Sequence, residues 1–341
     1  MDPLQLEAVL TRFGPAWQAV RIATPAAAGF SGAVIRQMTC QDGRYCLRGW
    51  PRNSLPIERI AGLHRLLDWI SRRGVRQVAV PIRDGEGVTL VEHHGRFWQI
   101  EPWMPGSADF SSNPSVSRLR SAMACLAAWH NASRSFAPHQ SEAKWFYQAS
   151  NTPSPAVHER IQRLREWKTR GLRADSTLIP GNSPVDYRAV ATHTIDLAAQ
   201  AAHRVSADLE SASRIPLSLQ PCLRDIWHDH VLFTGDEVTG LIDASACRSE
   251  NIATDLARLL GSFAGDDGKL WETAIGNYHA HRPLSDNERL LVRVLDDSGT
   301  LLSALAWIDR GHRFGPTIME SPRVLERMRR LATRLEHLAD R

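Results

Sequence analysis

The chain begins with helical periodicity and then changes to short strand-like runs. Apolar residues at helical spacing over 4–14, ended by Gly14, predict a first helix. Runs rich in β-branched and aromatic residues, separated by glycine-bearing turns, predict the strands that follow. The predicted strands cover 17–24, 33–40, 45–50, 77–82, 87–95 and 96–103.

One amphipathic helix interrupts these strands. Its apolar side chains form a single stripe, and Gly74 closes the helix predicted over 57–74. The stripe consists of Ile57, Ile60, Leu63, Leu66, Leu67 and Ile70.

Beyond residue 103 the pattern is mainly helical, with loop sequences at 151–155 and 178–184. Helices are predicted over 115–133, 156–172, 185–214 and 251–263, and further helical stretches continue to the end. The order of elements therefore predicts an α+β fold with two lobes. The first, over 1–103, is a small antiparallel β lobe with one helix, and the second, over 104–341, is larger and mainly helical.

A charged segment at 223–246 interrupts the predicted helices with the pattern of a β-hairpin. VLF begins a strand, TGDE turns the chain, and VTGLID returns. This return is expected to bring Asp225, His230 and Asp243 to one end of the hairpin. On the residues alone, three interpretations stay open: a phosphoryl-transfer loop, a zinc site that uses His228 and His230, and a turn with solvated ends.

Composition narrows the class of protein. Of 341 residues, 43% are hydrophobic, which is enough for a folded core, and no apolar run approaches the roughly 20 residues that span a bilayer. The net charge of +4 comes from scattered arginines, so we expect neither nucleic acid nor membrane as a partner. Five cysteines without a CxxC motif indicate reduced thiols, and we expect a cytoplasmic protein.

The hairpin resembles the catalytic segment of the aminoglycoside phosphotransferase and choline kinase superfamily, whose fold is like that of protein kinases. That family has H-G-D-x-x-x-x-N-[IVL]-L, a turn, then [IVL]-I-D-[FW], and a later D-L-A. By this resemblance Asp225 is the catalytic acid–base residue, and His230 and Asp243 are the metal ligands. Asp255 in TDLARLL takes the place of the last aspartate. Asp255 is expected to cap its helix or to accept backbone N–H bonds from the loop around Asp225.

The resemblance extends outward in chain order over about residues 20–263. AGFSGAV resembles the turn that covers the nucleotide, which assigns nucleotide binding to Gly29, Phe30, Ser31 and Gly32. YCLRGWP resembles the strand with the phosphate-pairing residue, here Arg48. IEPWMPG resembles the hinge, where the Glu101 carbonyl and the Trp103 N–H are the candidates for the base. LAAWHNAS resembles a helix of the larger lobe.

The sequence also departs from the family pattern. Leu223 and Arg224 replace the His-Gly pair, His230 replaces asparagine, and Ala244 and Ser245 follow Asp243. The basic residue is an arginine, and no lysine precedes Lys144. In the family, a helix glutamate pairs with this basic residue. Here Leu63 or His64 falls near the place of that glutamate, and Glu58 lies more than one helical turn before it.

The resemblance implies a phosphotransferase that uses ATP, or GTP, with Mg²⁺, or Mn²⁺ because of the imidazole. The acceptor is expected to be a hydroxyl of a small molecule, because the chain lacks the activation segment of protein kinases. The second hypothesis is a catalytically silent, kinase-like protein that binds a nucleotide or another ligand.

Overall fold

The computed structural model describes residues 3–17, 20–25, 32–172 and 178–341. Its fold is mixed α+β with antiparallel strand pairing, as the sequence predicts. Among the described helices, none is both long and apolar enough to cross a bilayer.

The chain packs into two compact units. The first comprises Met1–Tyr147, His228–Ser249 and Ala280–Arg282, and the second comprises Gln148–Trp227, Glu250–His279 and Pro283–Arg341. The charged hairpin thus packs with the β-rich region, whereas the loop with Asp225 belongs to the second unit. A lobe boundary after residue 103 stays a prediction.

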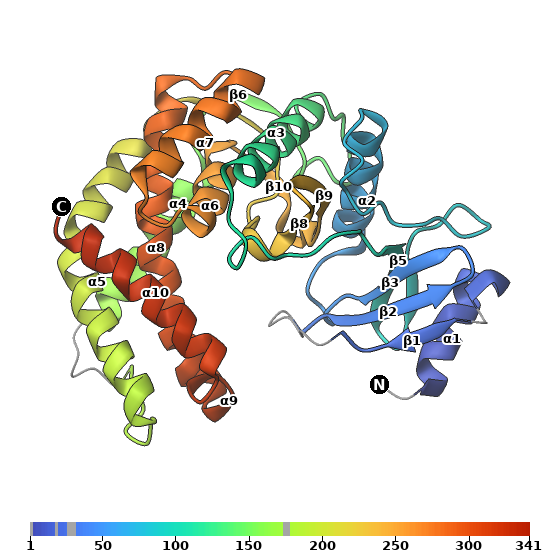
Figure 1. Ribbon diagram of the computed structural model, residues 1–341, viewed down its shortest axis with the longest axis horizontal. Helices are drawn as coiled ribbons and strands as arrows, with labels where there is room; N and C mark the ends of the chain where they lie inside the picture. The colour runs from blue at the N-terminus through green and yellow to red at the C-terminus, as the bar shows by residue number, and fades with distance from the viewer. Residues whose placement is uncertain (1–2, 18–19, 26–31, 173–177) are drawn as a thin grey trace. The chain divides into compact units, whose positions relative to one another are not determined.

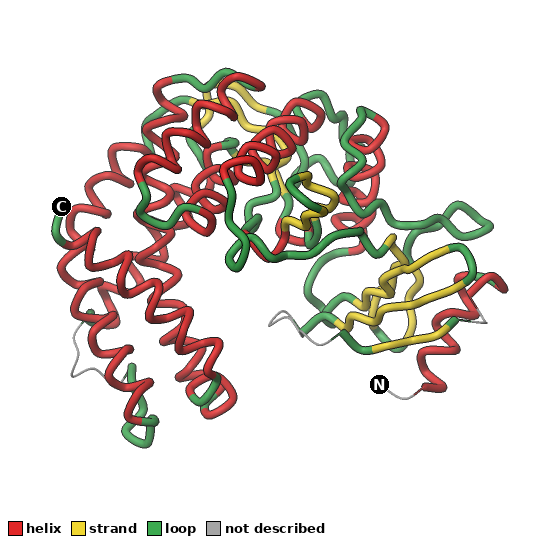
Figure 2. The backbone as a smooth tube through the Cα atoms, viewed as in Figure 1, coloured by secondary structure: helices red, strands yellow, loops and turns green. Residues whose placement is uncertain are grey.

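A five-stranded antiparallel sheet in the order β1-β2-β3-β5-β4 forms the β part of the first unit (Figures 1 and 2). The strands are β1 (Arg21–Ala23), β2 (Val34–Cys40), β3 (Gly43–Gly49), β4 (Val91–His93) and β5 (Arg96–Pro102). In the pairing of β3 with β5, Arg48 lies opposite Gln99 and Cys46 opposite Glu101. Because side chains on a strand alternate between faces, Arg48, Gln99 and Glu101 share one face of this sheet.

The first predicted helix is α1 (Pro3–Phe13), followed by a short 3₁₀ helix, η1 (Pro15–Trp17). α1 lies along the sheet (Figure 1) and buries its apolar face there. The contacting core consists of Leu6, Val9, Leu10, Phe13, Met38, Leu47, Val91, Trp98 and Ile100. The helix ends before Gly14, whose φ of 111° is a conformation that side chains with a Cβ rarely adopt.

The predicted amphipathic helix is α2 (Ile57–Arg72), and its stripe is buried except at Ile57, which is 45% exposed. A third α-helix of this unit, α3 (Val116–Ser133), is capped by Ser115, whose hydroxyl accepts from the N–H of Arg118. The Arg118 side chain then donates from Nε to the carbonyl of Gly235 at 2.9 Å. This contact fixes the turn of the hairpin formed by β8 (Val231–Thr234) and β9 (Glu237–Leu241).

The strand predicted over 77–82 was wrong. Val78 forms only an isolated parallel bridge with Leu241, and the Leu241 N–H donates to Gln77 O at 2.6 Å. Ile82 N–H instead donates to Ile100 O. The segment is apolar like a strand, but its hydrogen bonds go to two different neighbours, and Pro81 has no N–H to extend a ladder.

The second unit is mainly helical, and α5, α8 and α10 pack against one another (Figure 1). Its helices are α4 (Pro155–Arg170), α5 (Val185–Ala212), α6 (Ala253–Phe263), α7 (Gly268–His281), α8 (Asp286–Phe314), α9 (Pro316–Met319) and α10 (Pro322–Ala339). α5 and α8 approach closely where Gly311 leaves room for Tyr187, whose O–H donates to Ile308 O. α8 begins with a capping box between Ser285 and Glu288.

The sequence did not predict the small sheet of the helical region. It has the order β10-β7-β6, with β6 (Ala149–Thr152), β7 (Leu217–Cys222) and β10 (Arg248–Glu250). β6 lies partly in a sequence with loop composition, and β7 contains Pro221. Such short strands with proline carry little local signal.

Candidate active site

Arg48 on β3 lies between two carboxylates of the first unit. Its Nη1 donates to Asp243 Oδ1 at 3.1 Å, and its Nε donates to Glu101 Oε1 at 3.4 Å. Burial by itself would lower the pKa of Arg48, but Glu101 and Asp243 raise it above the ordinary value. The guanidinium is therefore a fixed positive charge with a planar set of donors.

Asp243 follows β9 in an unusual backbone conformation. Its φ of 57° lies in the left-handed region, and such conformations cluster at functional sites. His230 Nε2 lies 4.0 Å from Asp243 Oδ2, and Ile242 N–H donates to His230 O at 3.0 Å. Burial opposes ionisation of Asp243, but Arg48 and then His230 hold its pKa below the usual value. The hairpin therefore brings together the two residues that the sequence analysis assigns to the metal.

The separation of these two side chains is just within the span of one divalent cation. Bonds of about 2.1 Å to each ligand atom can span up to about 4.2 Å, which covers the 4.0 Å between His230 Nε2 and Asp243 Oδ2. An imidazole nitrogen beside a carboxylate oxygen suits borderline ions better than a set of oxygens alone. The assignment of His230 and Asp243 as metal ligands stays a prediction.

A buried hydrogen-bond network extends from the second carboxylate into the unit. Gln99 Nε2 donates to Glu101 Oε2 at 2.6 Å, and Gln99 Oε1 accepts from Trp50 Nε1 at 2.6 Å. His64 Nε2 lies 2.9 Å from the same Gln99 oxygen, so this nitrogen must be the donor. His64 Nδ1 then accepts from the Thr89 hydroxyl at 2.8 Å. The bonding pattern thus fixes one neutral tautomer of His64.

The electrostatics of the network agree with this tautomer. Burial lowers the pKa of His64 to about 4, although the bond to Gln99 acts in the opposite direction. Burial also raises the pKa of Glu101, against the effect of Arg48 and Gln99. His64, the residue near the place of the family's helix glutamate, therefore contacts β5 and carries no charge at neutral pH. The second carboxylate partner of Arg48 comes from β5 instead.

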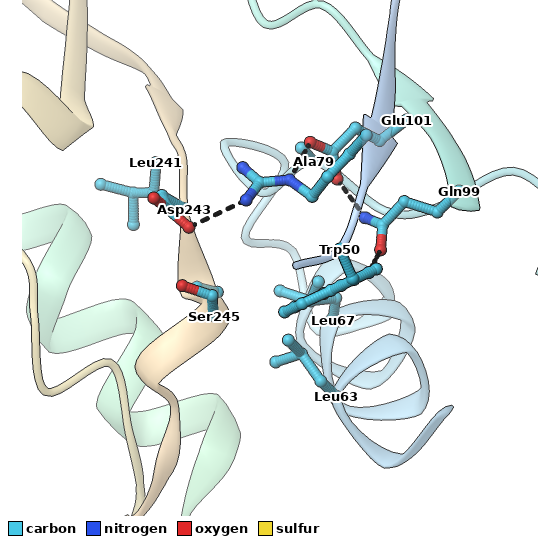
Figure 3. A pocket seen from close by; sticks show the side chains of 11 residues that line it. Trp50, Leu63, Leu67, Ala79, Gln99, Glu101, Leu241, Asp243 and Ser245 are labelled. Carbon is cyan, nitrogen blue, oxygen red and sulfur yellow. Dashed lines mark hydrogen bonds and ion pairs between the residues drawn. The ribbon is translucent and has the colours of Figure 1, made fainter. Parts of the chain in front are cut away.

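A pocket lies beside the Arg48 contacts (Figure 3). In this view Asp243 and Ser245 come from the segment after β9, and Gln99 and Glu101 lie across from them. Trp50, Leu63, Leu67, Ala79 and Leu241 provide apolar lining. Ala244 and Ser245 belong to a short 3₁₀ helix, η3 (Ala244–Ala246), that follows Asp243 directly. The pocket thus combines an apolar wall with a polar end formed by charged groups.

The remaining predicted nucleotide residues have different outcomes. Gly29, Phe30 and Ser31 lie outside the described residues. Gly32 is described, has a φ of 74° and is exposed. Trp103 N–H donates to Arg44 O at 3.0 Å, so a nucleotide would reach this donor only by displacing that bond. Nucleotide binding by these residues stays a prediction.

In the second unit, Asp255 of α6 holds the loop that carries Asp225. Asp255 is fully buried, and its two oxygens accept from the N–H groups of Leu223 at 2.8 Å and Arg224 at 2.5 Å. This confirms the expected bonding between Asp255 and the loop. Arg224 has a φ of 65°, at the position where the resembled family has glycine. Asp225 is half-exposed, and its Oδ1 accepts from Arg258 Nε at 3.0 Å.

The expected geometry for the zinc interpretation was wrong. His228 and His230 lie in a 3₁₀ helix, η2 (His228–His230), and not on a strand that would point both side chains the same way. His228 Nε2 is 3.3 Å from Asp229 Oδ1, its sequence neighbour. In the described part of the chain, no cluster of three metal-ligating side chains includes either histidine.

Sequence reasoning missed Gln99, Trp50 and Thr89 as members of the site. The spacing of Gln99 and Glu101 was the available signal, because alternate residues of a strand share a face. The role of Trp50 follows only from the pairing of β3 with β5, since Trp50 N–H donates to Phe97 O at the end of that ladder.

Comparisons with known proteins agree with the fold. The model of the family described as "Phosphotransferase enzyme family" matches residues 22–291. An aminoglycoside phosphotransferase from Alicyclobacillus acidocaldarius has a similar structure, with a TM-score of 0.68 and 19% identity over 100% of this chain and 96% of that one. Amicoumacin kinase hAmiN, solved with AMP-PNP and Ca²⁺, has a TM-score of 0.67 and 13% identity over 98% and 92% of the two chains.

The match to a microcompartment-associated aminopropanol kinase covers 100% of this chain and 97% of that one, with a TM-score of 0.63 and 14% identity. No curated protein sequence matches this chain. At these identities the solved structures establish a shared fold, that of small-molecule kinases with a protein-kinase-like architecture. The family model extends over most of the sequence, from β1 into α8, and the chain belongs to the phosphotransferase enzyme family.

Proposed function

We propose that this phosphotransferase transfers the γ-phosphoryl group of ATP to a hydroxyl of a small molecule. The observation that carries the proposal is the contact between Arg48 and Asp243. It places a fixed cation from the sheet beside a carboxylate that is itself close to His230. A phosphate-binding cation next to a metal-binding carboxylate is the arrangement that phosphoryl transfer needs. Support for a nucleotide comes from similar proteins solved with AMP-PNP or ADP.

Each residue has one part in the proposed reaction. Arg48 pairs with oxygens of the α- and β-phosphates through its planar fork of donors. His230 and Asp243 hold the divalent cation, which, when bound, neutralises charge on the phosphates. Asp225 orients the acceptor hydroxyl and takes its proton as the hydroxyl oxygen bonds to the γ-phosphorus. The bond from that phosphorus to the bridging oxygen breaks, and ADP leaves.

The pocket beside Arg48 has a volume of about 20 Å³, which is too small for a purine ring. We therefore place the base at the hinge segment around Glu101 and Trp103, and the phosphates at the charged end of the pocket beside Arg48. Glu101 would remain paired with Arg48 through its side chain, so the proposal leaves only its carbonyl for the base.

The test is thermal stabilisation by ATP, ADP and adenosine, with and without Mg²⁺ or Mn²⁺, followed by a screen for ATP consumption with hydroxylated metabolites. The proposal expects metal-dependent stabilisation by the nucleotides and acceptor-dependent release of ADP. It expects Arg48→Ala to weaken ATP more than adenosine, because only ATP offers phosphates. Equal weakening of both ligands would point to a structural role of Arg48, and nucleotide binding that does not depend on the metal would favour a catalytically silent binding protein.

A further inference from the structure

Arginine and tryptophan side chains alternate in a continuous stack within the second unit. The guanidinium of Arg327 lies 4.2 Å from the ring centre of Trp227 and 5.3 Å from that of Trp307. The guanidinium of Arg258 lies 5.9 Å from the ring centre of Trp227, and that of Arg310 lies 4.6 Å from the ring centre of Trp307. All four distances are within the range of cation–π contacts. We call Arg258, Trp227, Arg327, Trp307 and Arg310 the arginine–tryptophan stack.

The stack joins four separate segments of the chain. Trp227 follows the Asp225 loop, Arg258 comes from α6, Trp307 and Arg310 come from α8, and Arg327 comes from α10. α8 and α10 pack against each other (Figure 1). Because the contacts come from four segments, the stack depends on the tertiary packing of this unit. One charged helix face could not produce it.

Both ends of the stack act on Asp225, the proposed acid–base residue. Arg258 Nε donates to Asp225 Oδ1 at 3.0 Å. Arg310, at the other end, is close enough to Asp225 for their charges to interact. Burial lowers the pKa of Arg310, Asp225 opposes this, and Arg163 of α4 lowers it further. Two arginines, Arg258 and Arg310, therefore interact with the residue at the proposed position of the acceptor hydroxyl.

Arginines predominate among these residues. Arg163, Arg258, Arg310 and Arg327 all belong to the set, together with the carboxylate of Asp225. Arg163 and Arg310 are exposed, and neither forms a hydrogen bond or ion pair within the described residues. Exposed positive charges such as those of Arg163 and Arg310 raise the local concentration of anions and repel cations.

Stacking on tryptophan also prepares these arginines to bind. A guanidinium that rests its flat face on an indole ring keeps its N–H donors at the edge, where they can reach an anion. Because the rings hold the side chains in place, less conformational entropy is lost when a ligand binds. A fork of donors held in this way matches the two oxygens of a carboxylate or the oxygens of a phosphate.

We infer that the acceptor is an anionic hydroxyl compound, a hydroxy acid or a phosphorylated alcohol, and not a polycation. The hydroxyl of the acceptor lies at Asp225, and the carboxylate or phosphate group of the same molecule lies at Arg310 and Arg327. This inference rests on the proposed function for the position of the hydroxyl. The anion site itself depends only on contacts within the second unit.

Binding of an anion can be tested without turnover. The probe is malonate, with malonamide as its neutral analogue, and the readout is thermal stabilisation at constant ionic strength. Four variants are compared with the wild type: Arg310→Gln and Arg327→Gln in the stack, and Arg313→Gln and Arg330→Gln as controls on the same two helices. Both controls remove exposed arginines that pair with acids one helical turn away, Asp309 and Glu326.

Malonate is expected to stabilise the wild type and both controls, and malonamide is not. Each stack variant should weaken the apparent affinity for malonate by about 10- to 100-fold, the loss expected for a charged hydrogen bond. Arg310 is exposed, so Arg310→Gln should fold normally even if Arg327→Gln does not. Equal responses in all five proteins, or no advantage of malonate over malonamide in the wild type, would overturn the inference.

Acceptor choice provides the second readout. Glycerate, glycerol and serinol share a carbon skeleton and hydroxyl groups but differ in charge. ATP consumption should be greatest with glycerate, and Arg310→Gln should raise its KM while leaving the KM for ATP unchanged. A preference for serinol would overturn the anionic acceptor while leaving the phosphotransferase proposal intact. If the nucleotide does not bind at all, the proposed function fails, and the malonate comparison still decides whether the anion site exists.

Discussion

The guanidinium of Arg48 and the carboxylate of Asp243 are 3.1 Å apart, although 195 positions separate them in the sequence. The same guanidinium also contacts Glu101. Two acids on one base leave a net negative charge around Arg48 before any cation binds. A divalent ion at His230 and Asp243 would balance that charge, which links phosphate binding by Arg48 to metal binding by Asp243.

Arg48 should be essential for the stability of this charge cluster. Arg48→Met leaves Glu101 and Asp243 without their cation, and removing one partner of a buried pair costs roughly 3–5 kcal/mol. The low end is expected here because the Asp243 side chain is 30% exposed. Urea unfolding measures the loss. The double variant Arg48→Met/Glu101→Gln should recover part of it, and a double variant less stable than the single one would contradict the argument.

Asp243 should be required for metal and dispensable for folding. Asp243→Asn keeps the shape of the side chain, and asparagine tolerates the left-handed backbone at a φ of 57°. We therefore expect nearly unchanged stability in urea but no Mg²⁺- or Mn²⁺-dependent stabilisation by ADP. ADP binding without metal provides the internal control, because Arg48 remains. Retention of the metal effect in Asp243→Asn would remove Asp243 from the ligand set.

Asp225 should affect turnover and not nucleotide binding. Asp225→Asn loses the proton acceptor, and general-base catalysis typically contributes about 10²–10⁴-fold. The expected result is a fall in kcat of that size with an unchanged KM for ATP. Asp229→Asn, four residues away and also about half-exposed, is the matched control and should behave like the wild type. Wild-type turnover in Asp225→Asn would refute the catalytic assignment.

The sequence predicted most elements because their signals are local. The stripe of α2, the ends of α1 at Gly14 and α3 at Ser115, and the hairpin of β8 and β9 depend on residues within a few turns of one another. The bonding of Asp255 to the 223–224 backbone was also predictable, because the family pattern fixes both segments. The prediction of a strand over 77–82 was wrong because an apolar run does not specify whether a partner strand is available.

The side-chain partners could not be predicted in the same way. The contact of Arg48 with Glu101 and that of His64 with Gln99 depend on strand register and on the helix orientation over the sheet. The arginine–tryptophan stack brings together residues 227, 258, 307, 310 and 327, which share no local motif. Tertiary packing decides these pairs, and one sequence shows only that the residue types are present.

His64 should make the stability of the protein sensitive to mild acid. Its pKa is about 4 in the fold, below the ordinary value of 6.5, because the ring is buried and neutral. Between these pH values the unfolded chain binds a proton that the folded protein does not. The contribution of neutral His64 to the free energy of unfolding is therefore fully present above pH 6.5 and is lost as the pH falls toward 4. The lowering of the His64 pKa from 6.5 to about 4 corresponds to roughly 3 kcal/mol.

His64→Gln tests this directly. Glutamine can donate to Gln99 and accept from Thr89 but does not titrate, so the variant should lose stability more slowly between pH 6.5 and 4 than the wild type. Urea unfolding at several pH values gives both slopes. His193→Gln is the control, because His193 is exposed and pairs with Glu336 on the surface. If His64→Gln and the wild type lose stability in parallel over this range, His64 is charged in the fold, and the tautomer that orders Gln99 beside Glu101 is not the one described.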